Sequence, residues 1–395
     1  MTMKRSNDRI RTSHAGSLPR SMALLDQLQA KDTGAAYDHD GLAQQIHASV
    51  IDVVRKQAEL GIDTVDDGEH SKSSFAAYTR VRLGGFSPSE DRFGFSGKTR
   101  DQLQFSDVYD EQRAMYAARP SARAIPKRRG TVVCTGPVTY TGQAQVQADI
   151  DNLRAAMADA QRDEGFITAL SPNNIALYYR NDYYKSEEDY LVALADAMRE
   201  EYQAIVAAGF LVQIDDPRLA THYDRHPDIT IAECRKFIAR QIEVINYALR
   251  GIPADRVRCH TCYSTTVAPR VHDLELKHYG DLMLTINAGA YSFEASNPRH
   301  EHEWQFWETV KLPEDKILLP GVVSHCVALV EHPELVAQRI LRFAKVVGRE
   351  RVVASNDCGF ATAGAGDEVH PDVAWAKLAA LVEGARIATK ELWAR

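Results

Sequence analysis

The chain has 395 residues, of which 45% are hydrophobic and 26% are charged, and its formal net charge at pH 7 is −7. This length and hydrophobic content allow a large core, in one large α/β domain or two smaller ones. Because charges of both signs are interspersed and their sum is negative, we expect no basic face for nucleic acid or for an anionic membrane.

The sequence predicts a soluble, cytoplasmic protein. It contains no run of about 18 apolar residues, and its opening Met-Thr-Met-Lys-Arg-Ser-Asn is not that of a signal peptide. Six cysteines are scattered through the chain, unlike the dense pattern of a disulfide scaffold. We therefore expect free thiols or metal ligands.

Helices and short apolar strands alternate along most of the chain. Apolar residues near 3.6 spacing predict helices at 40–60, 188–208, 229–250, 333–347 and 371–392. Short apolar runs predict eight strands at 62–66, 131–135, 166–170, 211–214, 257–262, 290–293, 317–323 and 352–355.

This alternation predicts an α/β fold, a parallel (β/α)₈ TIM barrel, as a single domain over residues 1–395. Residues 11–20 form a polar loop, either part of the site or a solvated N-terminal arm. Residues 71–128 form a long, partly helical insertion after the first predicted strand.

Reactive side chains fall at or just past the carboxyl ends of the predicted strands. They are Glu69, Asp215, His260, Cys262, Glu294, His325 and Cys358. Barrel enzymes build their active sites on this face. The sequence therefore predicts one site at the carboxyl end of the barrel.

His260 and Cys262 suggest a metal site. Residues i and i+2 of a strand point the same way, so the imidazole and the thiol share one space. Glu294 and Cys358 follow two other strands and could complete a catalytic zinc site. Thiolates with an imidazole favour zinc. The alternative is a metal-free pocket with a core thiol and a hydrogen-bonded histidine.

Two acidic groups, Glu69 and Asp215, lie on the same face. They could recognise the ammonium group of a substrate. Alternatively, they are a helix N-terminal charge or a hydrogen-bond partner of a zinc-bound histidine.

Further histidines lie near the predicted site. His300 and His302 could hold a second metal, but the alternating charges around them favour a solvated helix start. His325 and Cys326 could line the pocket without binding metal.

At this point the motifs resemble those of a known family. His260-x-Cys262, Glu294 in Phe-Glu-Ala-Ser and the Asp-Cys-Gly around Cys358 are similar to the zinc motifs of the catalytic barrel of cobalamin-independent methionine synthase. The resemblance continues in three more motifs: His14-Ala-Gly-Ser-Leu-Pro-Arg20, Gly68-Glu69 and Gln213-Ile-Asp-Asp-Pro217. The motifs occur in the same order over residues 11–360.

The resemblance implies a zinc-dependent transferase that activates a thiol as thiolate for alkyl transfer. Its thiol would be homocysteine, its methyl donor 5-methyltetrahydrofolate, and the active form could be a homo-oligomer. It implies four zinc ligands, His260, Cys262, Glu294 and Cys358. Of these, His260, Cys262 and Cys358 would be catalytic residues, because they hold the metal that activates the thiol. It also implies substrate-binding residues, namely His14, Ser17, Glu69 and Asp215.

The chain also departs from the family pattern. It resembles the short, single-barrel members, and Asp216 stands where the family has glutamate. The stretch 171–175 lacks the tryptophan expected near a folate. Residues 289–304 look closer to epoxyalkane:coenzyme M transferase. Thiol addition to an epoxide or another non-folate electrophile, and a non-catalytic zinc-binding barrel, therefore stay open as alternatives.

Overall fold

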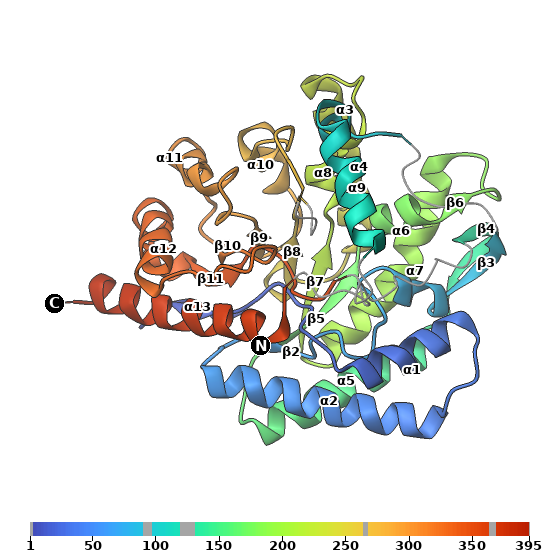
Figure 1. Cartoon of the computed structure of the whole chain (residues 1–395), viewed down its shortest axis with the longest axis horizontal. Coiled ribbons are helices and arrows are strands. Elements are labelled where there is room, and N and C mark those ends of the chain that lie inside the picture. Colours follow the sequence, from blue (N-terminus) through green and yellow to red (C-terminus); the bar gives the residue numbers. More distant parts are fainter. Residues whose placement is uncertain (1–2, 90–96, 119–130, 264–267, 363–368, 395) are drawn as a thin grey trace.

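An eight-stranded parallel sheet lies at the centre of the molecule (Figure 1). The computed structural model describes residues 3–89, 97–118, 131–263, 268–362 and 369–394. The strands follow the order β1-β11-β10-β9-β8-β7-β5-β2. Their bounds are β1 Arg11–Thr12, β2 Val65–Asp66, β5 Gly165–Leu170, β7 Leu211–Asp215, β8 Val257–His260, β9 Ala290–Phe293, β10 Ile317–Val323 and β11 Val353–Asn356.

Two backbone hydrogen bonds join the two edges of this sheet. The carbonyl of Thr12, at the end of β1, accepts from the amides of Asp63 and Thr64, both at 3.1 Å, just before β2. The sheet thus curls back on itself. The predicted TIM-barrel fold is confirmed.

One predicted barrel strand is wrong. The run 131–135 lies in β4 (Thr131–Tyr140), which pairs with β3 (Leu83–Ser89) and β6 (Arg180–Asn181) in a separate three-stranded sheet. Its place in the barrel is taken by β1, from the predicted N-terminal loop. An apolar run signals a buried strand but not its partner, and a two-residue strand is too short to leave a pattern.

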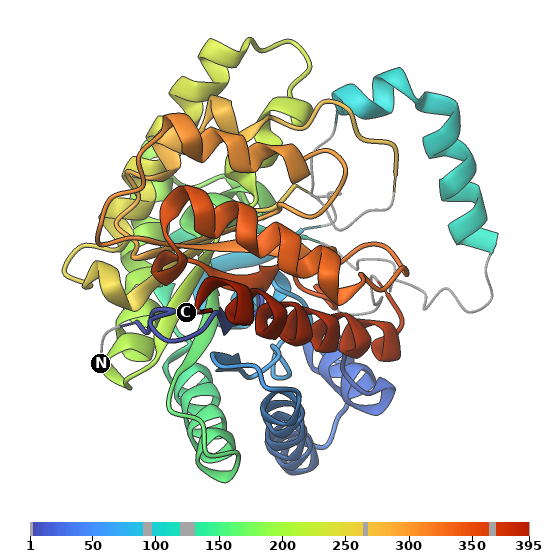
Figure 2. The same ribbon diagram turned by 90° about the vertical axis from the view of Figure 1, so that its left-hand side faces the viewer.

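Helices surround the barrel (Figure 2). They are α1 (Met22–Thr33), α2 (His39–Leu60), α5 (Gln143–Asp159), α6 (Pro172–Tyr178), α7 (Glu187–Ala207), α8 (Arg218–Arg225), α9 (Ile231–Ala248), α10 (Gly280–Met283), α11 (Phe306–Thr309), α12 (Pro333–Val347) and α13 (Pro371–Leu392). α2, α5, α7 and α9 pack in sequence order along one side of the barrel, and α13 packs against both α12 and α2. No helix in the described part of the chain is long and apolar enough to cross a membrane.

The predicted insertion holds both helix and strand. Besides β3 it contains the short helix η1 (Ala77–Val81), α3 (Arg100–Gln104) and α4 (Ser106–Ala118); residues 90–96 and 119–128 of the prediction lie outside the described residues. α4 stands away from the barrel (Figure 2). Asp101 of α3 accepts from the amides of Val271 and His272, in the loop that follows β8. The insertion therefore approaches the carboxyl face of the barrel.

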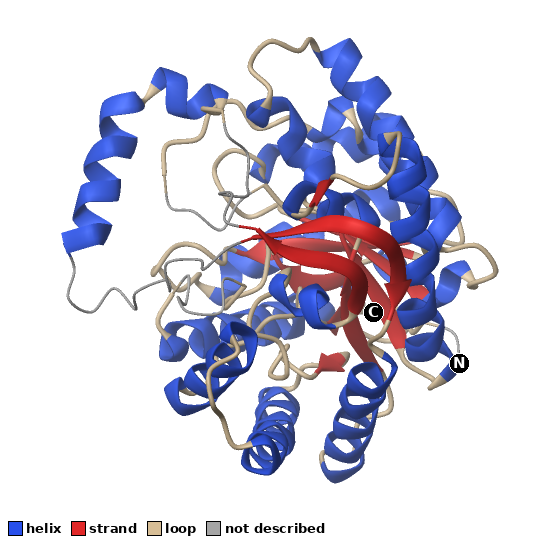
Figure 3. Cartoon of the chain, turned by 90° about the vertical axis from the view of Figure 1, so that its right-hand side faces the viewer, coloured by secondary structure: helices blue, strands red, loops and turns tan. Residues whose placement is uncertain are grey.

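The strands of the barrel are drawn in red in Figure 3, and the residues they enclose change in character along the barrel axis. At the amino ends of the strands lies a small apolar cluster of Ala290, Ile317, Leu319 and Val353, against which Met3 packs. In the middle, the buried guanidinium of Arg258 lies 3.8 Å from the ring centre of Phe166 and donates to the hydroxyl of Ser13. Two residues further along the same strand, His260 begins the carboxyl-end layer.

Candidate active site

Three of the predicted ligands converge. One ring nitrogen of His260 and the sulfurs of Cys262 and Cys358 all lie within 4.8 Å of one another, and all three side chains are buried. His260 ends β8, Cys262 follows it, and Cys358 follows β11. The cluster therefore lies at the carboxyl end of the barrel, where the strand pattern placed it.

His260 has the form that a metal requires. Burial, followed by the positive charge of Arg258, lowers the pKa of His260 to about 3, so its ring is neutral at pH 7. Its Nδ1 lies 2.9 Å from the hydroxyl of Ser292, its neighbour in register on β9. Nε2 is buried without a hydrogen-bond partner. With Nδ1–H donated to Ser292, the lone pair of Nε2 is available to a metal.

The two thiols also fit a zinc ion. The Sγ atoms of Cys262 and Cys358 are 3.3 Å apart, and neither cysteine forms a disulfide. Two thiolates bound at about 2.3 Å to one tetrahedral zinc lie about 3.8 Å apart. Only a small shift separates the two arrangements. Two thiols with one imidazole form a donor set that zinc prefers.

Glu294 lies near these ligands but is held by its own loop. Its Oε1 accepts from the amide of Tyr263 at 2.7 Å, and its Oε2 accepts from Asn297 Nδ2 at 2.6 Å and from Arg270 Nη2 at 3.4 Å. Among the described residues, the cluster of mutually close ligand atoms does not include it. In this arrangement Glu294 shapes the loop beside the ligands.

Ser17 lies against the turn that follows Cys358. The carbonyl of Ser17 accepts from the amide of Phe360 at 2.8 Å, and its hydroxyl accepts from the amide of Ala361 at 3.3 Å. A Cβ at Gly359 would lie 2.1 Å from Ser17 Oγ. Glycine at 359 is thus what allows the N-terminal loop to lie beside Cys358.

Glu69 and Asp215 form an acidic pair in the barrel. Oε1 of Glu69 accepts from the hydroxyl of Thr168 at 2.9 Å, while Oε2 has no hydrogen-bond partner. Oδ1 of Asp215 accepts from Gln213 at 2.9 Å. Burial, followed by the charge of Glu69, raises the pKa of Asp215 well above its usual range. A pair of buried carboxyl groups such as this favours a cationic ligand between them.

His14 is buried, and both of its ring nitrogens are hydrogen-bonded. Nε2 is 2.8 Å from Gln57 Oε1, and Nδ1 accepts from the amide of Gly16 at 3.3 Å. Arg258 donates to the carbonyl of His14 at 2.9 Å. These contacts fix the path of the N-terminal loop toward Ser17.

The other two histidine motifs play different parts. His300 is buried, not solvated, and its ring lies 3.0 Å from Glu303 and 3.1 Å from Asp273, whereas His302 is exposed. His325 is buried and Cys326 is partly buried after β10. Within the described residues, none of these four side chains belongs to the metal-ligand cluster.

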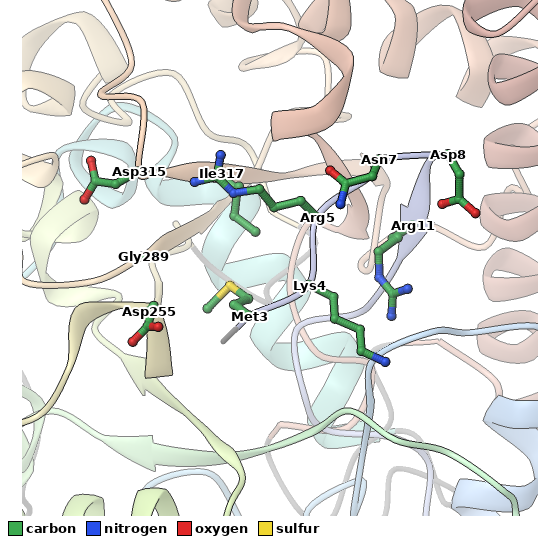
Figure 4. Close-up of a pocket in the computed structure, with 10 residues that line it drawn as sticks. All are labelled: Met3, Lys4, Arg5, Asn7, Asp8, Arg11, Asp255, Gly289, Asp315 and Ile317. Atoms are coloured by element: carbon green, nitrogen blue, oxygen red, sulfur yellow. The ribbon is translucent and has the colours of Figure 1, made fainter. Parts of the chain in front are cut away.

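A cavity of about 630 Å³ opens at the opposite end of the barrel (Figure 4). Its lining residues come from the N-terminal arm and from the segments that lead into the strands: Met3, Lys4, Arg5, Asn7, Asp8, Arg11, Asp255, Gly289, Asp315 and Ile317. Charges of both signs line it, and none of the predicted site residues does.

A parallel barrel with an imidazole and two thiols at its carboxyl end defines a candidate metal centre in a (β/α)₈ protein. The chain belongs to the family described as cobalamin-independent synthase, catalytic domain, whose profile matches residues 10–177 and 164–382. The resemblance seen in the sequence motifs is thereby confirmed.

Similar proteins agree with this assignment. Methionine synthase of Saccharolobus islandicus is 26% identical over 385 residues, covering 96% of this chain and 95% of that protein. Methionine synthase of Thermococcus kodakarensis is 24% identical, covering 96% and 94%. A solved B12-independent methionine synthase from Shewanella sp. W3-18-1, in complex with selenomethionine, has the same fold, with a TM-score of 0.71 at 20% identity, covering 98% of this chain and all of that one.

Several residues of the site escaped the sequence reasoning. Arg258 could have been found, because it precedes His260 by two positions in a strand and so shares its face. Ser292 precedes Glu294 in the same way. Lys72 and Thr168, which contact each other near Glu69, left no signal, because their meeting depends on tertiary structure.

Proposed function

We propose that this protein is a zinc-dependent transferase that activates homocysteine as its thiolate and methylates it from 5-methyltetrahydrofolate, as a methionine synthase does. The convergence of His260, Cys262 and Cys358 at the carboxyl end of the barrel carries this proposal. Membership of the family and the names of the similar proteins support it.

The reaction needs a thiolate at neutral pH. A free alkyl thiol has a pKa of about 8.5, and a thiol coordinated to zinc loses its proton. The chain's part is to present the ligands. His260, oriented by Ser292, and the sulfurs of Cys262 and Cys358 would hold the metal. Glu294 would serve as the fourth ligand if it gave up the contact with Arg270, the longest of its three hydrogen bonds at 3.4 Å.

The remaining residues would orient the amino acid end of homocysteine. Glu69 Oε2, which accepts no hydrogen bond within the protein, and Asp215 would accept from the ammonium group. The hydroxyl of Ser17 already accepts from the amide of Ala361, so its hydrogen can be donated to the substrate carboxylate. His14 would act by holding this loop in place.

Methyl transfer is then a displacement between positioned groups. The thiolate sulfur attacks the methyl carbon in line, the S–C bond forms and the C–N bond breaks. The donor reacts with this nitrogen already protonated, so the electron pair of the broken bond neutralises the nitrogen, which leaves as a secondary amine. Holding both partners converts a bimolecular step into an effectively unimolecular one.

One feature favours a second candidate, thiol addition to an epoxide or another non-folate electrophile. None of the four tryptophans lies in the segments after β5 and β7. The side-chain amides of Asn173 and Asn174 donate to the carboxylate of Asp216 at 2.8 and 2.7 Å, and all three side chains are buried. These polar groups offer no broad ring surface for a pteridine. A non-catalytic zinc barrel is the third candidate.

Metal analysis with a substrate screen separates the three. We expect one zinc per chain, an additional sulfur ligand by zinc X-ray absorption after homocysteine is added, and methionine formed from methyltetrahydrofolate. Sulfur exchange with epoxide opening but no use of folate would favour the second candidate. A zinc site that does not respond to any thiol would leave only the third.

A further inference from the structure

A buried lysine lies next to the acidic pair and takes no part in the scheme above. Lys72 is 1% exposed. Its ammonium donates to the carbonyl of Thr168 at 2.6 Å and to the hydroxyl of Thr168 at 2.9 Å, and it lies 4.6 Å from the ring centre of Tyr78. One carbonyl oxygen, one hydroxyl oxygen and one aromatic face thus accommodate the three hydrogens of this ammonium group.

These contacts fix the direction of the next hydrogen bond. An ammonium group has hydrogens but no lone pair, so Thr168 Oγ1 must accept from Lys72. The single hydroxyl hydrogen of Thr168 is then left for Glu69 Oε1, 2.9 Å away. Gly16 packs closely over the methyl group of Thr168, because a Cβ at Gly16 would lie 2.6 Å from Thr168 Cγ2.

The backbone of Glu69 is fixed as firmly as its side chain. Its φ is +60°, an uncommon value for a residue other than glycine and one that costs about 1 kcal/mol or more. The amide of Glu69 donates to Asp67 Oδ1 at 2.9 Å, and its carbonyl accepts from the amide of Lys72 at 2.9 Å. Oε2 is buried 3.6 Å from Nη2 of Arg20 and accepts no hydrogen bond, so it can still accept one from a ligand.

We propose that Thr168 and Lys72 are positioning residues that engage one oxygen of Glu69 and reserve the other for the ammonium group of an α-amino thiol. This inference rests on the proposed function. It makes the amino group a determinant of specificity: a thiol without an amino group would leave Glu69 Oε2 buried without a hydrogen bond, which is costly. The charge of Lys72 also lowers the pKa of Asp215, opposing the effect of burial.

The test compares two thiols. Binding of homocysteine and of 4-sulfanylbutanoate, which lacks only the amino group, is measured by calorimetry with the purified protein and no methyl donor. We expect the unaltered protein to prefer homocysteine. Thr168→Val, which keeps the shape but removes the hydroxyl, should lower that preference about 10-fold. The change should come from weaker binding of homocysteine, with the binding of 4-sulfanylbutanoate unchanged. Thr168→Ser, which keeps the hydroxyl, is the matched control and should retain the preference.

The outcomes separate this inference from the proposed function. If the unaltered protein does not prefer homocysteine, the proposed substrate is wrong. If it does and the valine variant keeps the preference, the positioning role is wrong. A valine variant that weakens both thiols equally shows a merely structural role and also overturns it. Should Thr168→Val not fold, as judged by circular dichroism, Thr168→Ala, which only removes atoms, decides between the same results.

Discussion

Two buried glutamates at opposite ends of the barrel differ in what their oxygens do. Glu164, at the amino end, accepts from the amide of Lys4 and from the hydroxyl of Thr64, both at 2.7 Å, and lies 3.6 Å from Arg11. Glu69, at the carboxyl end, also lies 3.6 Å from an arginine, Arg20, but only its Oε1 accepts a hydrogen bond, and its Oε2 accepts none.

This difference shows where the chain stabilises itself and where it is prepared for a ligand. A buried polar atom without a partner costs free energy, so each one that persists needs an explanation. Glu69 Oε2 and His260 Nε2 both lie at the carboxyl end of the barrel and accept no hydrogen bond, and His260 also belongs to the cluster with the two thiols. A bound substrate ammonium and a bound metal would satisfy them.

The largest effect is expected at the thiols. Cys358→Ser should remove bound metal and reduce methyl transfer by more than about 100-fold, because loss of a ligand costs more than loss of its supporting hydrogen bonds. Zinc content per chain and initial rates are measured on the same preparation. Cys234→Ala, a buried cysteine of α9 away from the site, is the control and should keep its zinc. A Cys358→Ser variant with full metal and full activity would dismiss the proposed ligand set.

Removing the charge of Glu69 should have the next largest effect. Glu69→Gln keeps the size of the side chain but loses a charge-assisted hydrogen bond to the substrate ammonium, worth about 1.5–3 kcal/mol. We expect KM for homocysteine to rise about 30-fold or more while zinc content stays unchanged. Steady-state kinetics over a range of homocysteine concentrations measures this, and an unchanged KM would remove Glu69 from substrate binding.

The regular parts of the barrel could be predicted from the sequence alone. Helices α12 and α13 have the predicted bounds, because apolar spacing, a proline at the start and, for α12, a glycine at the end all agree. Period-two geometry predicted that His260 and Cys262 lie together.

The remainder depended on contacts that no local pattern encodes. The partners of β4 and the barrel role of β1 are set by long-range pairing. The three hydrogen bonds to Glu294 come from its own loop and from the segment after β8. Sequence reasoning could therefore place this carboxylate at a strand end, but could not show which groups hold it there.

His300 tests whether pairing, and not position along the barrel, decides the role of a buried group. It lies toward the carboxyl end, yet both ring nitrogens meet carboxylates. Burial alone would lower the pKa of His300. The hydrogen bonds to Asp273 and Glu303 and the charge of Glu294 outweigh burial and raise this pKa to about 9. The folded protein thus holds this proton more tightly than the unfolded chain, whose histidine titrates at about 6.5.

The sign of the pH effect follows. The stabilisation, on the order of 3 kcal/mol, is fully present below about pH 6.5 and is lost as the pH rises through about 9. Urea unfolding at several pH values should show this decline in stability. The His300→Gln variant should be less stable than the unaltered protein at pH 6 and should not show the decline. Tyr263, whose ring stacks on His300 at 3.8 Å, would still pack against glutamine. A variant with an unaltered pH profile would show that another group titrates.

The smallest effect is expected at the amino end, where Glu164→Gln is the counterpart of Glu69→Gln. Glutamine keeps an acceptor for the amide of Lys4 or the hydroxyl of Thr64 but loses the charge that faces Arg11. We expect a loss of about 1 kcal/mol in the free energy of unfolding, with kcat and KM for homocysteine unchanged within about 2-fold. Denaturant unfolding and steady-state kinetics on both variants complete the comparison. Suppose instead that KM rises as much in Glu164→Gln as in Glu69→Gln. The same change of charge would then act alike at both ends of the barrel, and the assignment of stability to the amino end and of substrate binding to the carboxyl end would be wrong.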